Sequence, residues 1–422
     1  MTTPLIPAAA DRPGDDPIFA LNSEAAARTE EGESIVNSTL GALVTDEGRL
    51  MVMESVQEAL ARIPLEAASA YAPISGAPSF LKGVIRDLFE GSTLESRAVA
   101  AATPGGTGAC YMALQNFVEP GQSFLTSSYY WGPYRIIAQH AGRGLETFRM
   151  YDDAGDFDTE AFATGVQDLV AAQGRALVLV NTPCHNPTGY SFDADDWAAV
   201  TSALLAASAQ GSVTLLIDFA YGKFAGDRSW REPVTTLVDA GVTVLFAWTA
   251  SKAFAQYGSR VGACVAVHRD AEQRRRIKNA LSYSCRATWS NCNHLGMLAI
   301  GEILSDPKLR ARSEDEREAL RQLLLERVEG FKSLANAAGL RYPRYEGGFF
   351  VAVFTPDAEI TCRAARERGV YLVPLHRAVR VALCATPASD LPRLVQTLAD
   401  GVRLAEETTT AATGAATDGS AR

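Results

Sequence analysis

The sequence predicts a two-part α/β protein, with a larger domain built on a mostly parallel central sheet flanked by helices and a smaller α+β domain. Two observations support this fold class. Short apolar runs alternate with helical patterns between about residues 105 and 286. These runs are almost continuously apolar, which is typical of strands that helices cover on both faces of a sheet. The length of 422 residues allows two or three domains.

The elements of the larger domain follow one another in a regular order. Strands are expected at residues 122–128, 145–150, 176–182, 213–221, 243–250 and 262–268. Helices are expected at residues 107–118, 132–142 and 193–209. The last of these helices carries aspartates in its first turn, where the helix dipole favours acidic side chains.

The smaller domain is expected after a long amphipathic helix at residues 308–339. Strands are predicted at residues 349–354, 370–374 and 379–385, and helices at residues 360–369 and 391–407. We expect residues 17–55 and 316–406 to form this domain and residues 56–315 to form the larger one. The ends, residues 1–16 and 407–422, are rich in small and polar residues and are predicted to be disordered.

Composition excludes several classes of protein. The 39 basic and 49 acidic residues give a net charge of −10, which argues against a nucleic-acid partner. No apolar run approaches the ~18 residues that a membrane span needs, and the start lacks the features of a signal peptide. The seven cysteines and five histidines show no metal-binding spacing, so we expect no metal site and a cytoplasmic location with reduced thiols.

Four clusters of glycine, polar and charged residues follow predicted strands, at the edge where open α/β sheets bind ligands. They are residues 103–109 (TPGGTGA), 181–189 (NTPCHNPTG), 218–221 (DFAY) and 251–262 (SKAFAQYGSRVG). The first suits a phosphate, because glycines and the free N–H groups of a helix N-terminus can approach an anion closely. The alternative for the first cluster is an ordinary turn, which has the same glycine-rich composition. The second cluster, rich in proline, glycine and asparagine, could also be a turn without a function.

Two side chains in these clusters are candidates for chemistry. Asp218 ends an apolar strand, so its carboxylate needs a cationic or hydrogen-bonding partner. Lys252 lies between two apolar strands, where desolvation would favour a nucleophilic amine that can form a Schiff base. A lone lysine can also be a solvated loop residue.

The order and spacing of these motifs resemble the class I pyridoxal-phosphate aminotransferases, and within them the aspartate/aromatic aminotransferase branch. The resemblance runs from DPIFALNSEAA through VNSTLGALVTDEG and AYAPISGAPSF to VRVALCATP, and so covers nearly all of the chain except its two tails. It implies fold type I of the pyridoxal-phosphate-dependent transferases, pyridoxal 5'-phosphate as cofactor, and a homodimer with shared active sites.

The resemblance also implies a role for each matched residue. Lys252 would form the Schiff base and move the proton, and Asp218 would pair with the pyridine nitrogen of the cofactor. Trp131 would stack on the ring, while Asn186 and Tyr221 would bond its 3'-oxygen. The phosphate would be held by Gly106, Thr107, Thr249, Ser251, Arg260 and, from the neighbouring subunit, Tyr71.

Arginines define the substrate that the resemblance implies. Arg380 would bind the α-carboxylate, and Arg286 would bind a distal carboxylate across the dimer interface, with Gly41 and Asn186 also at the substrate. Two arginines favour a dicarboxylic amino acid such as aspartate or glutamate. The alternative for Arg286 is a surface ion pair.

Three departures from the family pattern leave the reaction type open. Tyr134 stands where aspartate aminotransferases carry a histidine that backs the acid paired with the pyridine nitrogen. Residues 37–40 (NSTL) replace the usual run, and the spacing after Arg380 differs by one residue. The leading expectation is an aminotransferase. The alternative is another pyridoxal-phosphate reaction, such as β- or γ-elimination or replacement, or C–C bond formation. A regulator would need a basic DNA-binding module, for which the first 40 residues are too few and too acidic.

Overall fold

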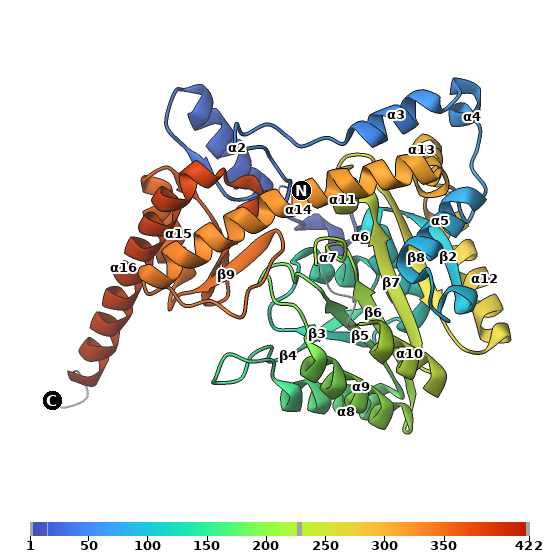
Figure 1. Cartoon of the computed structure of the whole chain (residues 1–422). Helices are drawn as coiled ribbons and strands as arrows, with labels where there is room; N and C mark the ends of the chain where they lie inside the picture. Colours follow the sequence, from blue (N-terminus) through green and yellow to red (C-terminus); the bar gives the residue numbers. More distant parts are fainter. Residues whose placement is uncertain (1–2, 15, 226–229, 419–422) are drawn as a thin grey trace. The chain divides into compact units, whose positions relative to one another are not determined.

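The computed structural model describes residues 3–14, 16–225 and 230–418 (Figure 1). The chain forms two compact units. The larger unit comprises Leu50–Glu326 and Pro343–Phe349, and the smaller unit comprises Met1–Arg49, Arg327–Tyr342 and Phe350–Arg422. Two of these divisions fall close to the expected ones at 55/56 and 315/316, whereas the segment 343–349 was expected in the smaller domain.

The larger unit contains a seven-stranded sheet in the order β2-β8-β7-β6-β5-β3-β4. Its strands are β2 (Ala98–Pro104), β3 (Ser123–Ser127), β4 (Gly144–Phe148), β5 (Arg175–Asn181), β6 (Ser212–Asp218), β7 (Thr243–Thr249) and β8 (Val261–Val267). Strands β3 to β7 run parallel, and β8 is antiparallel to both of its neighbours. The expected mostly parallel sheet is therefore confirmed.

Helices cover both faces of this sheet (Figure 1). Those of the larger unit are α3 (Glu54–Arg62), α4 (Leu65–Ser69), α5 (Pro78–Phe89), α6 (Gly105–Phe117), α7 (Pro133–His140), α8 (Thr159–Gln173), α9 (Ala194–Ser208), α10 (Arg231–Ala240), α11 (Ala250–Ala253), α12 (Ala271–Thr288) and α13 (His294–Ser305), with a 3-10 turn at Glu95–Arg97. On one face, α6, α7 and α12 share an apolar cluster with alternate strand residues such as Leu177, Leu216 and Leu245. Helices α8, α9 and α10 pack against the parallel strands elsewhere.

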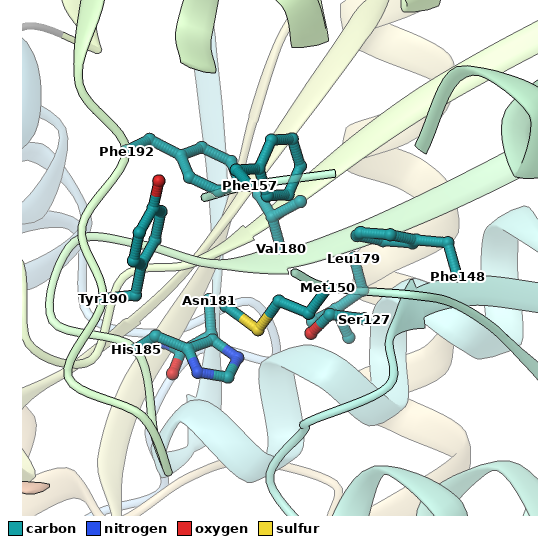
Figure 2. A pocket seen from close by; sticks show the side chains of 10 residues that line it. All are labelled: Ser127, Phe148, Met150, Phe157, Leu179, Val180, Asn181, His185, Tyr190 and Phe192. Carbon is teal, nitrogen blue, oxygen red and sulfur yellow. The ribbon is translucent and has the colours of Figure 1, made fainter. Parts of the chain in front are cut away.

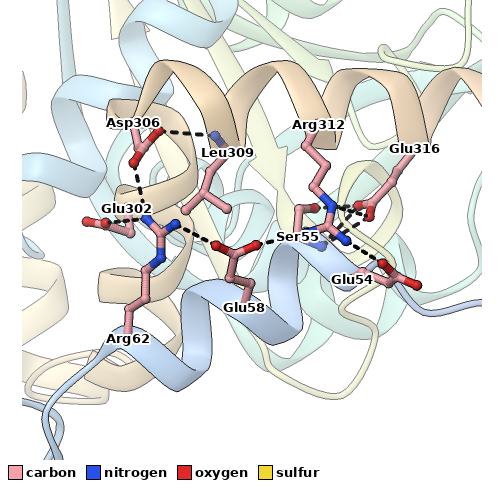
Figure 3. A network of polar contacts seen from close by, with 9 residues as sticks. All are labelled: Glu54, Ser55, Glu58, Arg62, Glu302, Asp306, Leu309, Arg312 and Glu316. Atoms are coloured by element: carbon pink, nitrogen blue, oxygen red, sulfur yellow. Dashed lines mark hydrogen bonds and ion pairs between the residues drawn. The ribbon is translucent and has the colours of Figure 1, made fainter.

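The long helix α14 (Pro307–Ala337) begins in the larger unit, where polar contacts join it to α3, and α3 in turn contacts α13 (Figure 3). Arg312 pairs with Glu58 at 2.8 Å. The Ser55 hydroxyl donates to Glu316 at 2.5 Å, and Arg62 of α3 reaches the end of α13. These contacts explain why the first part of α14 belongs to the larger unit beyond the expected boundary at residue 316.

The segment Pro343–Phe349 also belongs to the larger unit. Arg344 donates to Asp196 at 2.8 Å and also pairs with Asp193. The Phe349 ring packs against that of Tyr221, with centroids 5.2 Å apart. Ion pairs and ring contacts to residues far away in the sequence therefore override the sequential grouping that we expected.

The smaller unit contains two small sheets. Strand β1 (Val36–Asn37) pairs in parallel with β10 (Val370–Tyr371), and β11 (Val373–Leu375), β12 (Ala378–Ala382) and β9 (Phe350–Phe354) form an antiparallel sheet in the order β11-β12-β9. The expected strand at 370–374 is thus two strands, because the chain changes partners at Leu372. The helices are α1 (Pro7–Ala10), α2 (Pro17–Glu30), α15 (Ala358–Glu367) and α16 (Leu391–Asp418), with 3-10 turns at Leu383–Ala385 and Ala388–Asp390.

Both ends of the chain differ from the expected disorder. Helix α1 starts with a proline, which suits the first helical position, and α16 continues to Asp418. The hydroxyl groups of Thr408 and Thr410 bond carbonyls one turn earlier, and alanines favour the helix. Residues 1–2, 15 and 419–422 of the two expected tails lie outside the described residues. No helix in the described part of the chain is long and apolar enough to cross a membrane.

Candidate active site

A buried carboxyl group lies at the end of strand β6. Asp218 is only 8% exposed, and its Oδ2 accepts a hydrogen bond of 2.6 Å from the Tyr134 hydroxyl on α7. The Ala220 N–H donates to Oδ1 at 3.1 Å. Burial raises the pKa of Asp218, while these two donors and the charge of Lys252 act in the opposite direction. Such a group would be stabilised as a carboxylate by a cation beside it.

The amino group of Lys252, on the short helix α11, lies among aromatic rings. Its Nζ is 4.5 Å from the centre of the Tyr257 ring, 5.6 Å from that of Phe349 and 6.0 Å from that of Tyr221. An ammonium group is attracted to ring faces at these distances. No role was predicted for Tyr257 or Phe349, because contact between rings and an amine depends on packing rather than on a motif.

A hydrogen-bonded chain links the ends of strands β5 and β6. Asn186 donates to the Tyr221 hydroxyl at 3.4 Å, and its backbone N–H donates to Oδ1 of Asn181 at 2.6 Å. The Asn181 amide in turn donates to the backbone carbonyl of Asp218 at 2.8 Å. Sequence analysis missed Asn181, although it opens the motif 181–189 and pairs in register with Asp218 in the sheet.

The N-terminus of α6 meets the loop before β8 in an arrangement that fits a phosphate. Arg260 donates to the Ser251 hydroxyl at 3.2 Å, and the Thr249 and Ser251 hydroxyls are 2.9 Å apart. Gly105, at φ +71°, leaves room for the Arg260 guanidinium, because a Cβ there would lie 2.3 Å from Nη2. Gly106 follows in the same helical turn.

We call Gly106, Thr107, Thr249, Ser251 and Arg260 the phosphate cup. The charge balance of this cup also favours an anion. No side chain caps the N-terminus of α6, so the dipole and N–H groups of its first turn, which includes Thr107, remain available. Partial burial lowers the pKa of Arg260. In the described part of the chain, no carboxylate lies within ion-pair distance of its guanidinium.

Trp131 precedes α7 and is half-buried. Its ring meets that of Tyr134 edge-on, with centroids 5.4 Å apart and planes at 88°. The Tyr134 side chain therefore contacts both Trp131 and Asp218. Together with the phosphate cup and the Lys252 amine, these groups suit a flat phosphorylated ring with a basic nitrogen and a carbonyl that an amine can attack.

A small cavity beside the motif 181–189 does not have room for such a ligand. It has a volume of about 10 Å³ and is lined by Asn181, His185 and Tyr190 among others (Figure 2). Such a space holds at most one water molecule. The His185 Nδ1 lies 2.8 Å from the Thr188 hydroxyl, and burial lowers the pKa of His185 to about 3.

The remaining predicted residues lie elsewhere. Tyr71 is 93% exposed between α4 and α5, and Arg286 is exposed in the last turn of α12, where it donates to Ser290 at 3.3 Å. In the smaller unit, Arg380 of β12 donates to the Thr39 carbonyl at 2.5 Å and faces the Phe350 ring at 4.4 Å.

Gly41 belongs to the same part of the smaller unit, because a Cβ there would lie 2.6 Å from Cζ of Phe350. The larger unit thus assembles the predicted lysine, aspartate and phosphate-binding groups. In the smaller unit, Gly41 and Arg380 both lie next to the ring of Phe350.

Comparisons with known proteins show which family the chain resembles. Residues 35–398 match the family model for aminotransferases of class I and II. The aspartate aminotransferase of Pseudomonas aeruginosa is 30% identical over 381 residues, which are 87% of this chain and 93% of the relative. The aromatic-amino-acid aminotransferase of Paracoccus denitrificans is 30% identical over 85% of this chain and 91% of its own length.

Solved structures show the same fold. An aminotransferase from Anaerococcus prevotii superposes with a TM-score of 0.89 at 30% identity, covering 95% of this chain and all (100%) of that structure. An aromatic-amino-acid aminotransferase from Burkholderia pseudomallei, covalently bound to pyridoxal phosphate, has a TM-score of 0.79 at 24% identity, covering 93% and 98% of the two chains.

Proposed function

Since the chain belongs to the family of class I and II aminotransferases, we propose that it exchanges the amino group between a dicarboxylic amino acid and a 2-oxo acid. It is a pyridoxal-phosphate-dependent transferase. The observation that carries the proposal is the grouping, in one unit, of an amine among aromatic rings, a buried carboxyl group and an anion-binding helix N-terminus.

When bound, pyridoxal 5'-phosphate supplies an electron sink for the bonds at the substrate's α-carbon. Lys252 is proposed to hold the cofactor covalently and to move the proton at that carbon. The Asp218 carboxylate would keep the ring nitrogen protonated, which would strengthen the sink. Asn186 and Tyr221 would donate hydrogen bonds to the 3'-oxygen, and Trp131 would pack on the ring face.

The phosphate is assigned to the cup at the start of α6. Backbone N–H groups, hydroxyls and one guanidinium suit a dianion, because each donates hydrogen bonds. The guanidinium also carries a full positive charge, and the helix N-terminus carries a partial one. The proposed ligands are Gly106, Thr107, Thr249, Ser251 and Arg260, together with Tyr71 of the partner subunit.

The substrate assignment depends on two arginines. Arg380 is proposed to bind the α-carboxylate, with Gly41 and Asn186 beside the substrate. Arg286 of the partner subunit is proposed to bind the distal carboxylate. The name of the Pseudomonas relative, aspartate aminotransferase, supports this substrate class.

We propose that the protein acts as a homodimer in the cytoplasm. Tyr71 and Arg286 are exposed in the single chain, as residues that serve a second subunit would be, and Ile136 and Tyr283 of the same unit are exposed apolar side chains at 61% and 78%. No disulfide joins any of the seven cysteines, all of which lie in the described part of the chain, and this suits a reducing compartment.

The test is a comparison of amino donors with the purified, cofactor-loaded protein and 2-oxoglutarate or oxaloacetate as acceptor. We expect equimolar formation of the new amino acid and the new 2-oxo acid, with kcat/KM for aspartate or glutamate about 10²-fold above that for neutral amino acids. Ammonia or side-chain fragments released without a new amino acid would contradict transamination and favour elimination or replacement.

A further inference from the structure

Two uncharged side chains hold Asp218 from different sides. The Tyr134 hydroxyl donates to the carboxylate, and the Asn181 amide donates to the backbone carbonyl of the same residue. Both side chains are buried, with exposed fractions of 1% and 5%. They come from α7 and from the end of β5, so their contacts fix Asp218 relative to two separate elements.

Asn181 and Tyr134 each contact a second group of the proposed cofactor site. The Asn181 oxygen accepts the backbone N–H of Asn186, and the Tyr134 ring meets the edge of Trp131. The partners of Asp218 are therefore the same side chains that determine where Asn186 and Trp131 lie. A residue that served only the stability of the strand end would not need to contact these groups.

We propose that Tyr134 and Asn181 are positioning residues that act through Asp218, Tyr134 by keeping its carboxylate ionised and oriented and Asn181 by fixing its distance from Asn186. This inference rests on the proposed function. Burial alone favours the protonated acid, which could not hold a proton on the ring nitrogen. A hydrogen bond from a hydroxyl to a carboxylate is short and strong and stabilises the charged form.

The identity of the donor also matters. Burial and the neighbouring Asp218 charge raise the pKa of Tyr134 well above its ordinary value, so its hydroxyl keeps its proton. The Asn181 amide does not titrate. Both supports therefore donate to Asp218 without change of charge across the pH range in which the protein is folded.

The test compares Tyr134→Phe with a matched control, Tyr190→Phe. Tyr190 is also buried at 1% exposure, and its hydroxyl donates to Asp196 at 2.9 Å. Each variant removes one tyrosine–aspartate hydrogen bond and keeps the ring. Four quantities are measured: the pH midpoint of the visible absorption of the bound cofactor, the dissociation constant for pyridoxal phosphate, kcat and KM.

For Tyr134→Phe, we expect the midpoint to rise by roughly half a pH unit or more. Without the tyrosine donor, the buried Asp218 carboxylate takes up a proton more readily and no longer keeps the ring nitrogen protonated. The ring then withdraws fewer electrons, so the Schiff-base proton is held more tightly. We expect kcat to fall about tenfold while KM changes less than about threefold. Tyr190→Phe should lower thermal stability and leave the midpoint and kcat unchanged.

A second variant, Asn181→Leu, removes both amide contacts at similar side-chain size. We expect its dissociation constant for pyridoxal phosphate to rise about tenfold, because Asn186 and Asp218 are no longer tied together. It provides an independent test if Tyr134→Phe does not fold.

If the Tyr134 and Asn181 variants lose only thermal stability, with spectra, cofactor binding and kcat like those of Tyr190→Phe, the positioning role is wrong while the proposed function stands. If the wild-type protein gives no visible absorption with pyridoxal phosphate, the proposed function fails first, and the positioning role fails with it.

Discussion

The amino group of Lys252 lies 4.5 Å from the centre of the Tyr257 ring, within the same short stretch of chain. With Phe349 and Tyr221 also nearby, this contact limits the directions that the lysine side chain can take. A side chain with few available directions loses little conformational entropy when it reacts.

The first prediction concerns this amine. Lys252→Ala should abolish the visible absorption of covalently bound cofactor and lower turnover by at least ~10³-fold, because it removes the amine that is proposed to form the covalent link. Size-exclusion chromatography should still show the wild-type oligomer. Lys278→Ala, at an exposed position on α12, is the matched control and should keep both absorption and turnover. Near-wild-type activity of Lys252→Ala would refute the assignment.

The second prediction concerns the charge of Asp218. Asp218→Asn keeps the size of the side chain and an oxygen for the Tyr134 hydroxyl, but removes the charge that is proposed to hold the pyridinium proton. We expect kcat to fall ~10²-fold or more, equivalent to upwards of ~3 kcal/mol, with an unchanged circular dichroism spectrum. Asp153→Asn, at an exposed carboxylate, is the control. A loss below tenfold would indicate that Asp218 has only a structural role.

The third prediction concerns acid stability and His185. Its folded pKa is lowered to about 3 by burial, whereas in the unfolded chain it takes up a proton near pH ~6.5. Between these values the unfolded state binds more protons, so His185 makes the protein less stable as the pH falls from ~6.5 towards 3.

At pH 5 this loss amounts to about 2 kcal/mol. His185→Asn keeps an acceptor for Thr188 and does not titrate, so the unfolding free energy of the cofactor-free protein should depend less on pH between 7.5 and 5. Urea titrations at both pH values measure this difference. His140→Asn, at an exposed histidine, should behave like the wild type, and an unchanged pH dependence in His185→Asn would show that this histidine does not contribute.

The sequence was sufficient to predict those parts of the site that lie on strand ends. Asp218 and the motif that opens with Asn181 follow apolar runs, and the register of β5 with β6 then places them side by side. The hydrogen bond between Tyr134 and Asp218 was not predictable in this way, because 84 residues separate the two and their contact depends on how α7 packs. The family resemblance placed Tyr134 where a histidine backs the acid that pairs with the pyridine nitrogen, but it did not indicate which contact a tyrosine makes there.

The same reason limits what could be predicted of the fold. The expectation of a mostly parallel sheet left the direction of β8 open, because this direction depends on pairing with β2 and β7 and an apolar strand carries no sign of it. The segment Pro343–Phe349 joins the larger unit through the side chains of Arg344 and Phe349, which are individually unremarkable in the sequence. The local pattern of a sequence predicts its helices and strands. Contacts between residues far apart in the sequence decide which of these elements pack against one another.

The fourth prediction concerns substrate choice. If Arg286 binds a distal carboxylate in a site shielded from water, Arg286→Ala should lower kcat/KM for aspartate or glutamate more than ~10²-fold, because the carboxylate would be desolvated and unpaired. A neutral amino acid such as phenylalanine should lose much less. Arg276→Ala, on the exposed face of the same helix, is the control. Equal losses for both kinds of substrate would show that Arg286 does not select the side chain.

The last prediction tests whether active sites are shared between subunits. In the proposed dimer, Lys252 serves its own subunit and Arg286 serves the partner's site. A mixed dimer of a Lys252→Ala chain and an Arg286→Ala chain would then contain one site with both defects and one site with both wild-type residues.

Two inactive preparations should therefore regain activity towards a dicarboxylic substrate when they are unfolded, mixed and refolded together. Random pairing makes half of the dimers mixed, and one of the two sites in each is intact, so about a quarter of the wild-type activity is expected. The control replaces the Arg286→Ala chain with a Lys252→Ala, Arg286→Ala double variant, which cannot supply an intact site. If the mixture stays as inactive as this control although mixed dimers form, Arg286 acts in its own subunit or not at all.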